Sequence, residues 1–108
     1  MLALTLALAL AQAELPRPPF EALGQFIYWD QCMVYGAEAM AGSDRAPEQI
    51  LEIKLRDCRD HERRVQAELD AHQPSHAAAQ MERFRSMIRE QTLSAISRRR
   101  QPAPPTPN

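Results

Sequence analysis

Residues 32–58 read CMVYGAEAMAGSDRAPEQILEIKLRDC and place one cysteine on each side of a turn. Asp44 and Pro47 mark the turn, because these residue types favour turns and the first positions of helices. Cys32 lies twelve residues before Asp44, and Cys58 lies fourteen residues after it. In an antiparallel helical hairpin with a rise of ~1.5 Å per residue, the two cysteines lie nearly abreast. The segment therefore predicts two helices joined by a disulfide between Cys32 and Cys58.

The residues before this turn predict a long helix from about residue 19 to residue 41. When the helix is projected at ~100° per residue, one face collects Ala22, Phe26, Trp29, Met33, Ala37 and Met40, and further apolar residues lie on both flanks. A helix that is apolar around most of its circumference is usually covered by two neighbours. We therefore expect this helix to be the most deeply buried element of the fold.

Two more helices are predicted, over residues 47–71 and 76–98, because Pro74 cannot continue a helix. The apolar stripe of the first consists of Leu51, Leu55, Cys58, Val65 and Leu69. The thinner stripe of the second consists of Ala77, Met81, Phe84, Ile88, Thr92 and Ala95. Glycine is scarce, with three in the chain, and β-branched residues are few, which favours helix over sheet.

These patterns predict an all-α fold, a small antiparallel helical hairpin that is extended to a three-helix bundle and cross-linked by one disulfide. The side chains expected to be buried together are Phe26, Trp29, Leu51, Leu55, Val65, Met81, Phe84 and Ile88. The alternative is an extended hairpin whose third helix packs only in a homodimer, because the apolar stripe of that helix is modest.

The two ends of the chain are predicted to lie outside the helical domain. Residues 1–13 read MLALTLALALAQA, an apolar run followed by Ala-Gln-Ala, which is typical of a secretory signal peptide cleaved after Ala13. About ten apolar residues are too few for a transmembrane anchor, which needs ~20. Residues 14–18 are expected to be an extended lead-in, and the proline-rich residues 101–108 a disordered tail. The expected location is therefore periplasmic or secreted, where disulfides persist.

The composition limits the classes of partner. The chain has 108 residues, of which 25% are charged and 44% hydrophobic, as in a single globular domain. Its net charge of -1 argues against nucleic acid as a partner. The charge is uneven, however. Residues 14–44 hold one Arg against five acidic residues, and residues 73–108 hold six Arg against two Glu, so the two ends are expected to attract each other within the fold.

The cysteines and histidines indicate a structural disulfide rather than a metal or redox centre. Cys32 and Cys58 are too far apart for the Cys-x-x-Cys motif of thiol oxidoreductases, and no further cysteines complete a zinc site. His72 and His76 have four-residue spacing but are separated by a proline, and the methionines fall on core stripes. We therefore expect no cofactor. A periplasmic metal-binding or stress-sensing protein that uses His61, His72 and His76 is the alternative.

Two acidic residues lie where the helical pattern calls for apolar side chains. Asp30 falls within the apolar arc of the first helix, and Glu62 falls in the stripe of the second. Ionised carboxylates are rarely buried without a partner, and Arg85 at the edge of the third stripe is a candidate. We therefore predict a buried ion pair among Asp30, Glu62 and Arg85.

No catalytic motif accompanies these residues, since the chain lacks a Ser-His-Asp arrangement, a phosphate loop and a nucleotide fingerprint. The sequence therefore favours a non-catalytic exported protein of the cell envelope. Such a protein acts through a protein partner or in a structural role.

Overall fold

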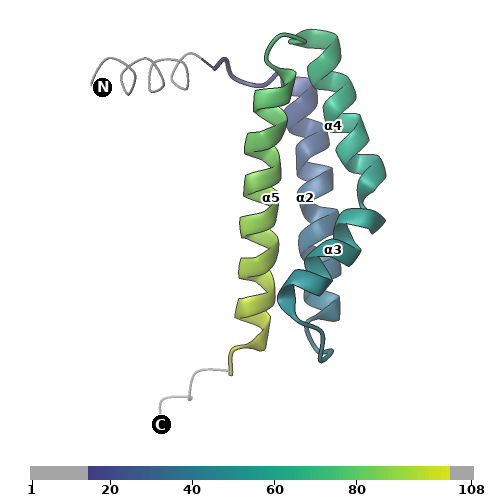
Figure 1. Ribbon diagram of the computed structural model, residues 1–108, viewed down its shortest axis with the longest axis vertical. Coiled ribbons are helices and arrows are strands. Elements are labelled where there is room, and N and C mark those ends of the chain that lie inside the picture. The colour runs from purple at the N-terminus through teal and green to yellow at the C-terminus, as the bar shows by residue number, and fades with distance from the viewer. Residues whose placement is uncertain (1–14, 103–108) are drawn as a thin grey trace, which may run out of the picture.

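The computed structural model describes residues 15–102, which form four helices and no strand (Figure 1). The helices are α2 (Phe20–Met40), α3 (Pro47–Asp57), α4 (Arg59–His72) and α5 (Ala77–Arg100). The prediction of an all-α fold with one disulfide is confirmed. The predicted signal peptide over residues 1–13 and most of the predicted tail lie outside the described residues.

The helix α2 occupies the centre of the arrangement, because α3, α4 and α5 all pack against it. Figure 1 shows α5 along one side of α2 and the bent pair α3 and α4 along the other. The chain runs along α2, returns through α3 and α4, and reverses again into α5, which is the predicted topology. Within residues 15–102, none of the helices is long and apolar enough to cross a membrane.

The structure divides the predicted helix 47–71 into α3 and α4 at Cys58. The backbone angles of Cys58, φ −98° and ψ 15°, depart from those of a helix, so the prediction of one continuous helix is wrong at this residue. Cys58 is completely buried and bonded to Cys32. A bend there lets Leu51 on α3 and Val65 on α4 pack in one core. Neither Gly nor Pro lies at the bend. The spacing of the apolar residues also continues through it, so the sequence pattern gave no sign of a break.

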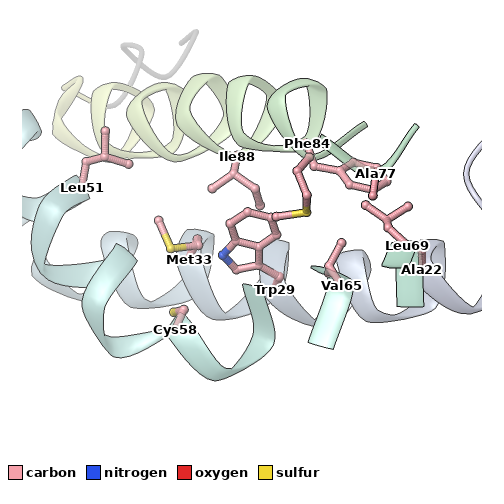
Figure 2. Packing of buried hydrophobic residues seen from close by; sticks show 11 residues of the cluster. Ala22, Trp29, Met33, Leu51, Cys58, Val65, Leu69, Ala77, Phe84 and Ile88 are labelled. Atoms are coloured by element: carbon pink, nitrogen blue, oxygen red, sulfur yellow. The ribbon is translucent and has the colours of Figure 1, made fainter. Parts of the chain in front are cut away.

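The core lies between α2 and the other three helices. Figure 2 shows the ring of Trp29 rising from α2 toward α5, between Met33 and Val65. Phe26 stacks on Phe84 with ring centroids 4.5 Å apart. Of the eight side chains predicted to be buried together, Trp29, Leu51, Val65, Met81, Phe84 and Ile88 are buried, and Phe26 and Leu55 are partly buried against the same cluster. The predicted core is thus confirmed for six of the eight side chains.

The end of α5 is fixed to the loop between α2 and α3 by Arg100. Its guanidinium donates to the backbone oxygens of Ala41 at 2.9 Å, Ser43 at 3.0 Å and Arg45 at 2.7 Å. Ile96, one turn earlier, is completely buried in a second small apolar cluster. The third predicted helix therefore packs within the monomer, so the homodimer is not needed to cover its apolar stripe.

Residues 15–19 lie across the opposite end of the bundle and lead into α2 without helical structure. The side-chain amide of Gln73 donates to the backbone oxygen of Arg17 at 3.0 Å. The amide of Gln80, which is 2% exposed, donates to the backbone oxygen of Pro16 at 3.1 Å. These two hydrogen bonds hold the lead-in against the α4–α5 turn.

Candidate functional site

The disulfide joins α2 to the junction of α3 and α4. The Cα atoms of Cys32 and Cys58 are 6.0 Å apart, which is a usual separation for a bonded pair. Cys58 is completely buried and Cys32 is partly buried. The predicted disulfide is therefore present, and its burial within the core points to a structural role.

Glu62 and Arg85 form an ion pair between α4 and α5. The Nε of Arg85 donates to Oε2 of Glu62 at 3.0 Å, and its Nη1 donates to Glu82 at 3.2 Å. The hydrogen bond to Glu62 raises the pKa of the guanidinium. The Glu62 side chain is 22% exposed and that of Arg85 is 46% exposed. The pair lies at the edge of the core, not within it, and contributes at most about 1 kcal/mol.

Asp30 is separate from this pair. It takes part in none of the ion pairs formed by the described residues. Its carboxylate faces α5 and lies against the side-chain amide of Gln91. In the amide orientation that satisfies both groups, the Gln91 nitrogen donates to both carboxylate oxygens. Burial raises the pKa of the Asp30 carboxyl above its ordinary value. The structure thus does not bring Asp30 together with Glu62 and Arg85.

The three histidines are not gathered at one place. The Nε2 of His72 lies 3.4 Å from Glu68 and 3.8 Å from Glu21, in a partly exposed group where α2 begins and α4 ends. His61 is partly buried on α4, and His76 precedes α5. Residues 15–102 contain no group of three or more His, Cys, Asp or Glu side chains placed to hold a metal ion.

The side of α2 that points away from the bundle carries large apolar side chains on both sides of the polar residues Gln31 and Glu38. Of the six large apolar side chains that are exposed in the described residues, five lie on this helix: Phe20 (86% exposed), Leu23 (40%), Ile27 (55%), Tyr28 (59%) and Tyr35 (65%). We call these five residues the outward face of α2. Their spacing places them on one broad side of the helix.

This exposure corrects the expectation that α2 is the most deeply buried element, because four of its residues are buried whereas eight residues of α5 are buried. The residues of α2 that are completely buried are Ala22, Trp29, Met33 and Ala37, which repeat at helical spacing and face the other helices. With only α5 on one flank and α3 and α4 on the other, a third side of α2 stays open. The apolar residues on both flanks of the predicted stripe were the signal in the sequence that could have revealed this face.

The outward face of α2 continues into an apolar cavity of about 270 Å³ beside α5. The cavity is lined by Leu15, Pro16, Pro18, Leu23, Phe26, Gln80, Arg83, Phe84 and Met87. Met87, which is 42% exposed, is the sixth exposed large apolar side chain. Because Leu23 belongs both to the cavity and to the outward face, apolar surface extends from α2 onto the lead-in and α5.

The charge on α2 has one sign. The helix contains Glu21, Asp30 and Glu38 and neither Lys nor Arg. On the α5 side, a cavity of about 560 Å³ is lined by Asp30, Val34, Glu90, Gln91, Ser94 and Arg98. The outward face of α2 therefore has Asp30 and Glu21 at its edges and Glu38 within it.

A second hollow, of about 520 Å³, lies between α3, α4 and α5 and gathers charged side chains of both signs. Its lining residues are Leu51, Glu52, Leu55, Arg56, Arg59, Glu62, Arg85 and Arg89. Arg89 pairs with Glu48 at 2.6 Å, and Arg85 pairs with Glu62. These ion pairs connect α5 to α3 and α4, and they account for two of the four arginines.

The arrangement as a whole has exposed apolar side chains on α2 and one disulfide, with a covered core behind them. Comparison of the chain with protein family models, with curated proteins and with solved structures gave no match.

Proposed function

We propose that this protein is a non-catalytic exported protein of the cell envelope that acts by binding another protein through the outward face of α2. The observation that carries the proposal is the exposure of Phe20, Leu23, Ile27, Tyr28 and Tyr35 along one helix. From Phe20 to Tyr35 the face extends over about 22 Å at ~1.5 Å per residue. Large apolar side chains that are exposed together on one side of a helix are typical of interaction sites.

The composition of the face supports a protein partner. Tyr28 and Tyr35 each present an apolar ring with a hydroxyl that can bond to water or to a partner, and aromatic residues are enriched at protein interfaces. The spacing of Phe20, Leu23 and Ile27 resembles the i, i+3, i+7 anchors of helices that bind in grooves or against other helices. Four of these five side chains are more than half exposed, so they are available for contact without unfolding.

Export is supported by the disulfide and by the N-terminal sequence. A buried bond between Cys32 and Cys58 suits an oxidising compartment, and residues 1–13 have the pattern of a signal peptide. We expect N-terminal sequencing of protein recovered from the periplasm or medium to begin at Glu14. Recovery of soluble cytoplasmic protein that begins with an intact Met1 would contradict the proposed compartment.

Photo-crosslinking in producing cells tests the binding function. A photoreactive phenylalanine analogue at Ile27 or Tyr35 is expected to give one discrete crosslinked product. The same analogue at Arg64, an exposed position on α4, serves as the matched control and is expected to give none. Equal products from all three positions, or no product from either α2 position, would contradict a binding role for the outward face of α2.

A further inference from the structure

We propose that the partner presents a basic amphipathic helix, with one Lys or Arg side chain placed against Asp30 while its apolar side covers the outward face of α2. The proposal rests on the binding function above and adds the chemistry of the partner.

Asp30 lies at the edge of the outward face of α2. It follows Ile27 by three residues and precedes Val34 by four, so it is a neighbour of both on the helix surface. Its contact on α5 is the neutral amide of Gln91. The carboxylate forms no ion pair with a cation among the described residues.

The cavity beside Asp30 has room for a long side chain. Its volume is about 560 Å³, and its lining includes Val34 as well as a second acid, Glu90 on α5. The aliphatic stem of Lys or Arg can lie along an apolar side chain such as Val34 while its charged end reaches a carboxylate. Arg98, also in the lining, is one turn beyond Ser94 and donates to its hydroxyl at 3.4 Å. The part of the cavity near Asp30 and Glu90 thus favours an incoming cation.

Desolvation of Asp30 supports the same conclusion. Burial is the cause of the raised pKa of its carboxyl, which means that the ionised group has lost water without gaining a cation. Such a group gains more from an added positive charge than a fully hydrated surface carboxylate does. A partner that supplies a cation at this point therefore gains affinity from Asp30.

Charge also disfavours the other occupants. Two copies of α2 packed face to face would place three acidic side chains and neither Lys nor Arg on each helix of the contact, which is electrostatically unfavourable. The residues of this chain outside the described range carry one charged side chain, the acidic Glu14. Neither terminal segment can therefore supply a side-chain cation to Asp30. A basic helix of another protein satisfies both the apolar face and the carboxylate.

The test uses the purified protein and two synthetic amphipathic helical peptides of about 18 residues, with the same leucine face and with either Lys or Gln on the other side. We expect the Lys peptide to bind and to shift amide resonances of residues 20–35 in NMR spectra. The Gln peptide is expected to bind at least about tenfold more weakly, because it lacks the charged contact.

Two variants separate the proposal from simple attraction to an acidic protein. Asp30→Asn is expected to weaken the Lys peptide about tenfold and to leave binding of the Gln peptide unchanged. The matched control is Asp44→Asn in the exposed loop, which removes the same charge and is expected to change neither affinity. Equal weakening by both variants, or no binding of the Lys peptide, would overturn the proposal.

The outcomes also separate this proposal from the function on which it rests. If Asp30→Asn has no effect while the double variant Phe20→Gln, Ile27→Gln abolishes binding, the outward face of α2 binds proteins but Asp30 does not receive a cation. Self-association of the protein in sedimentation experiments would identify a second copy as the occupant. In protein produced with residues 1–13 retained, nuclear Overhauser contacts between these residues and Ile27 would identify the chain's own N-terminal segment. Either result would overturn the proposal.

Discussion

The rings of Phe26 on α2 and Phe84 on α5 stack with their centroids 4.5 Å apart and their planes inclined by 21°. Phe26 also meets the edge of Trp29, with the two planes at 88°. This aromatic group joins the centre of α2 to α5 and lies between the covered core and the exposed Met87 on the next turn. It shows that α5 is part of the core of the monomer.

Loss of the Phe84 ring is expected to destabilise the protein strongly. Phe84 is 4% exposed, and truncation of a buried Phe to Ala costs about 3 to 5 kcal/mol. Met87→Ala, one turn away at a side chain that is 42% exposed, is the control and should cost less than about 1 kcal/mol. Urea unfolding of the two variants measures both values. Similar costs for the two would show that α5 does not pack as described.

Removal of the disulfide is expected to cost about 3 to 4 kcal/mol, because the bond closes a loop with a sequence separation of 26. The double variant Cys32→Ala, Cys58→Ala measures this cost by urea unfolding, and reduction of the unaltered protein is an independent measure. Mass spectrometry of the exported protein should show one peptide pair linked through Cys32 and Cys58. Two alkylatable thiols in that sample would contradict the bond.

Replacement of Thr92 by Val is expected to stabilise the protein by about 1 kcal/mol. The Thr92 hydroxyl is completely buried, and it has no hydrogen-bond partner among the described residues, so its desolvation is not compensated. Valine keeps the branched shape and a similar helix propensity. Thr92→Ser, which keeps the hydroxyl and loses the methyl group, is the control and should destabilise. A loss of stability in Thr92→Val would show that the hydroxyl is bonded.

Asp30→Asn is expected to raise the free energy of unfolding at neutral pH, by less than about 1 kcal/mol since the carboxylate is partly solvated. Because burial raises the pKa of Asp30 in the folded state, the folded protein binds this proton more tightly than the unfolded chain does. The contribution of Asp30 is therefore most favourable at low pH and falls as the pH rises through the folded pKa.

The increase in the free energy of unfolding caused by Asp30→Asn should accordingly vanish below about pH 3, where the carboxyl is protonated in both the folded and the unfolded state. Denaturant unfolding of the variant and of the unaltered protein across this range measures the difference. If Asp30→Asn instead lowers the free energy of unfolding at neutral pH and not at pH 3, Asp30 has a cationic partner within the fold.

Much of the fold could be predicted from the sequence because the apolar period and the turn residues agree. Pro47 and Pro74 place the two turns, and Cys32 and Cys58 come abreast because the helices between them have similar lengths. The core residues Trp29, Val65 and Ile88 follow from helical spacing alone. These features depend on local sequence, so they can be predicted from the spacing of apolar residues and from the turn residues.

The remaining features depend on contacts between helices. The bend at Cys58 has no Gly or Pro to mark it, and whether apolar residues such as Ile27 and Tyr35 are covered depends on how many helices surround α2. The partner of Glu62 could be named because Arg85 lies at the edge of a stripe. The position of Asp30 beside Gln91 could not be predicted, because it depends on the rotation of α2 relative to α5, which is set by packing between the helices.

The measurement that tests the account most directly is the free energy of unfolding of the double variant Phe20→Gln, Ile27→Gln. Our central claim is that the outward face of α2 is not part of the core and is free to bind a partner. The account predicts a change within about 0.5 kcal/mol, with loss of the crosslinked product formed from Tyr35. A loss of more than about 2 kcal/mol, as for buried apolar side chains, would contradict it by showing that the fold itself uses this face.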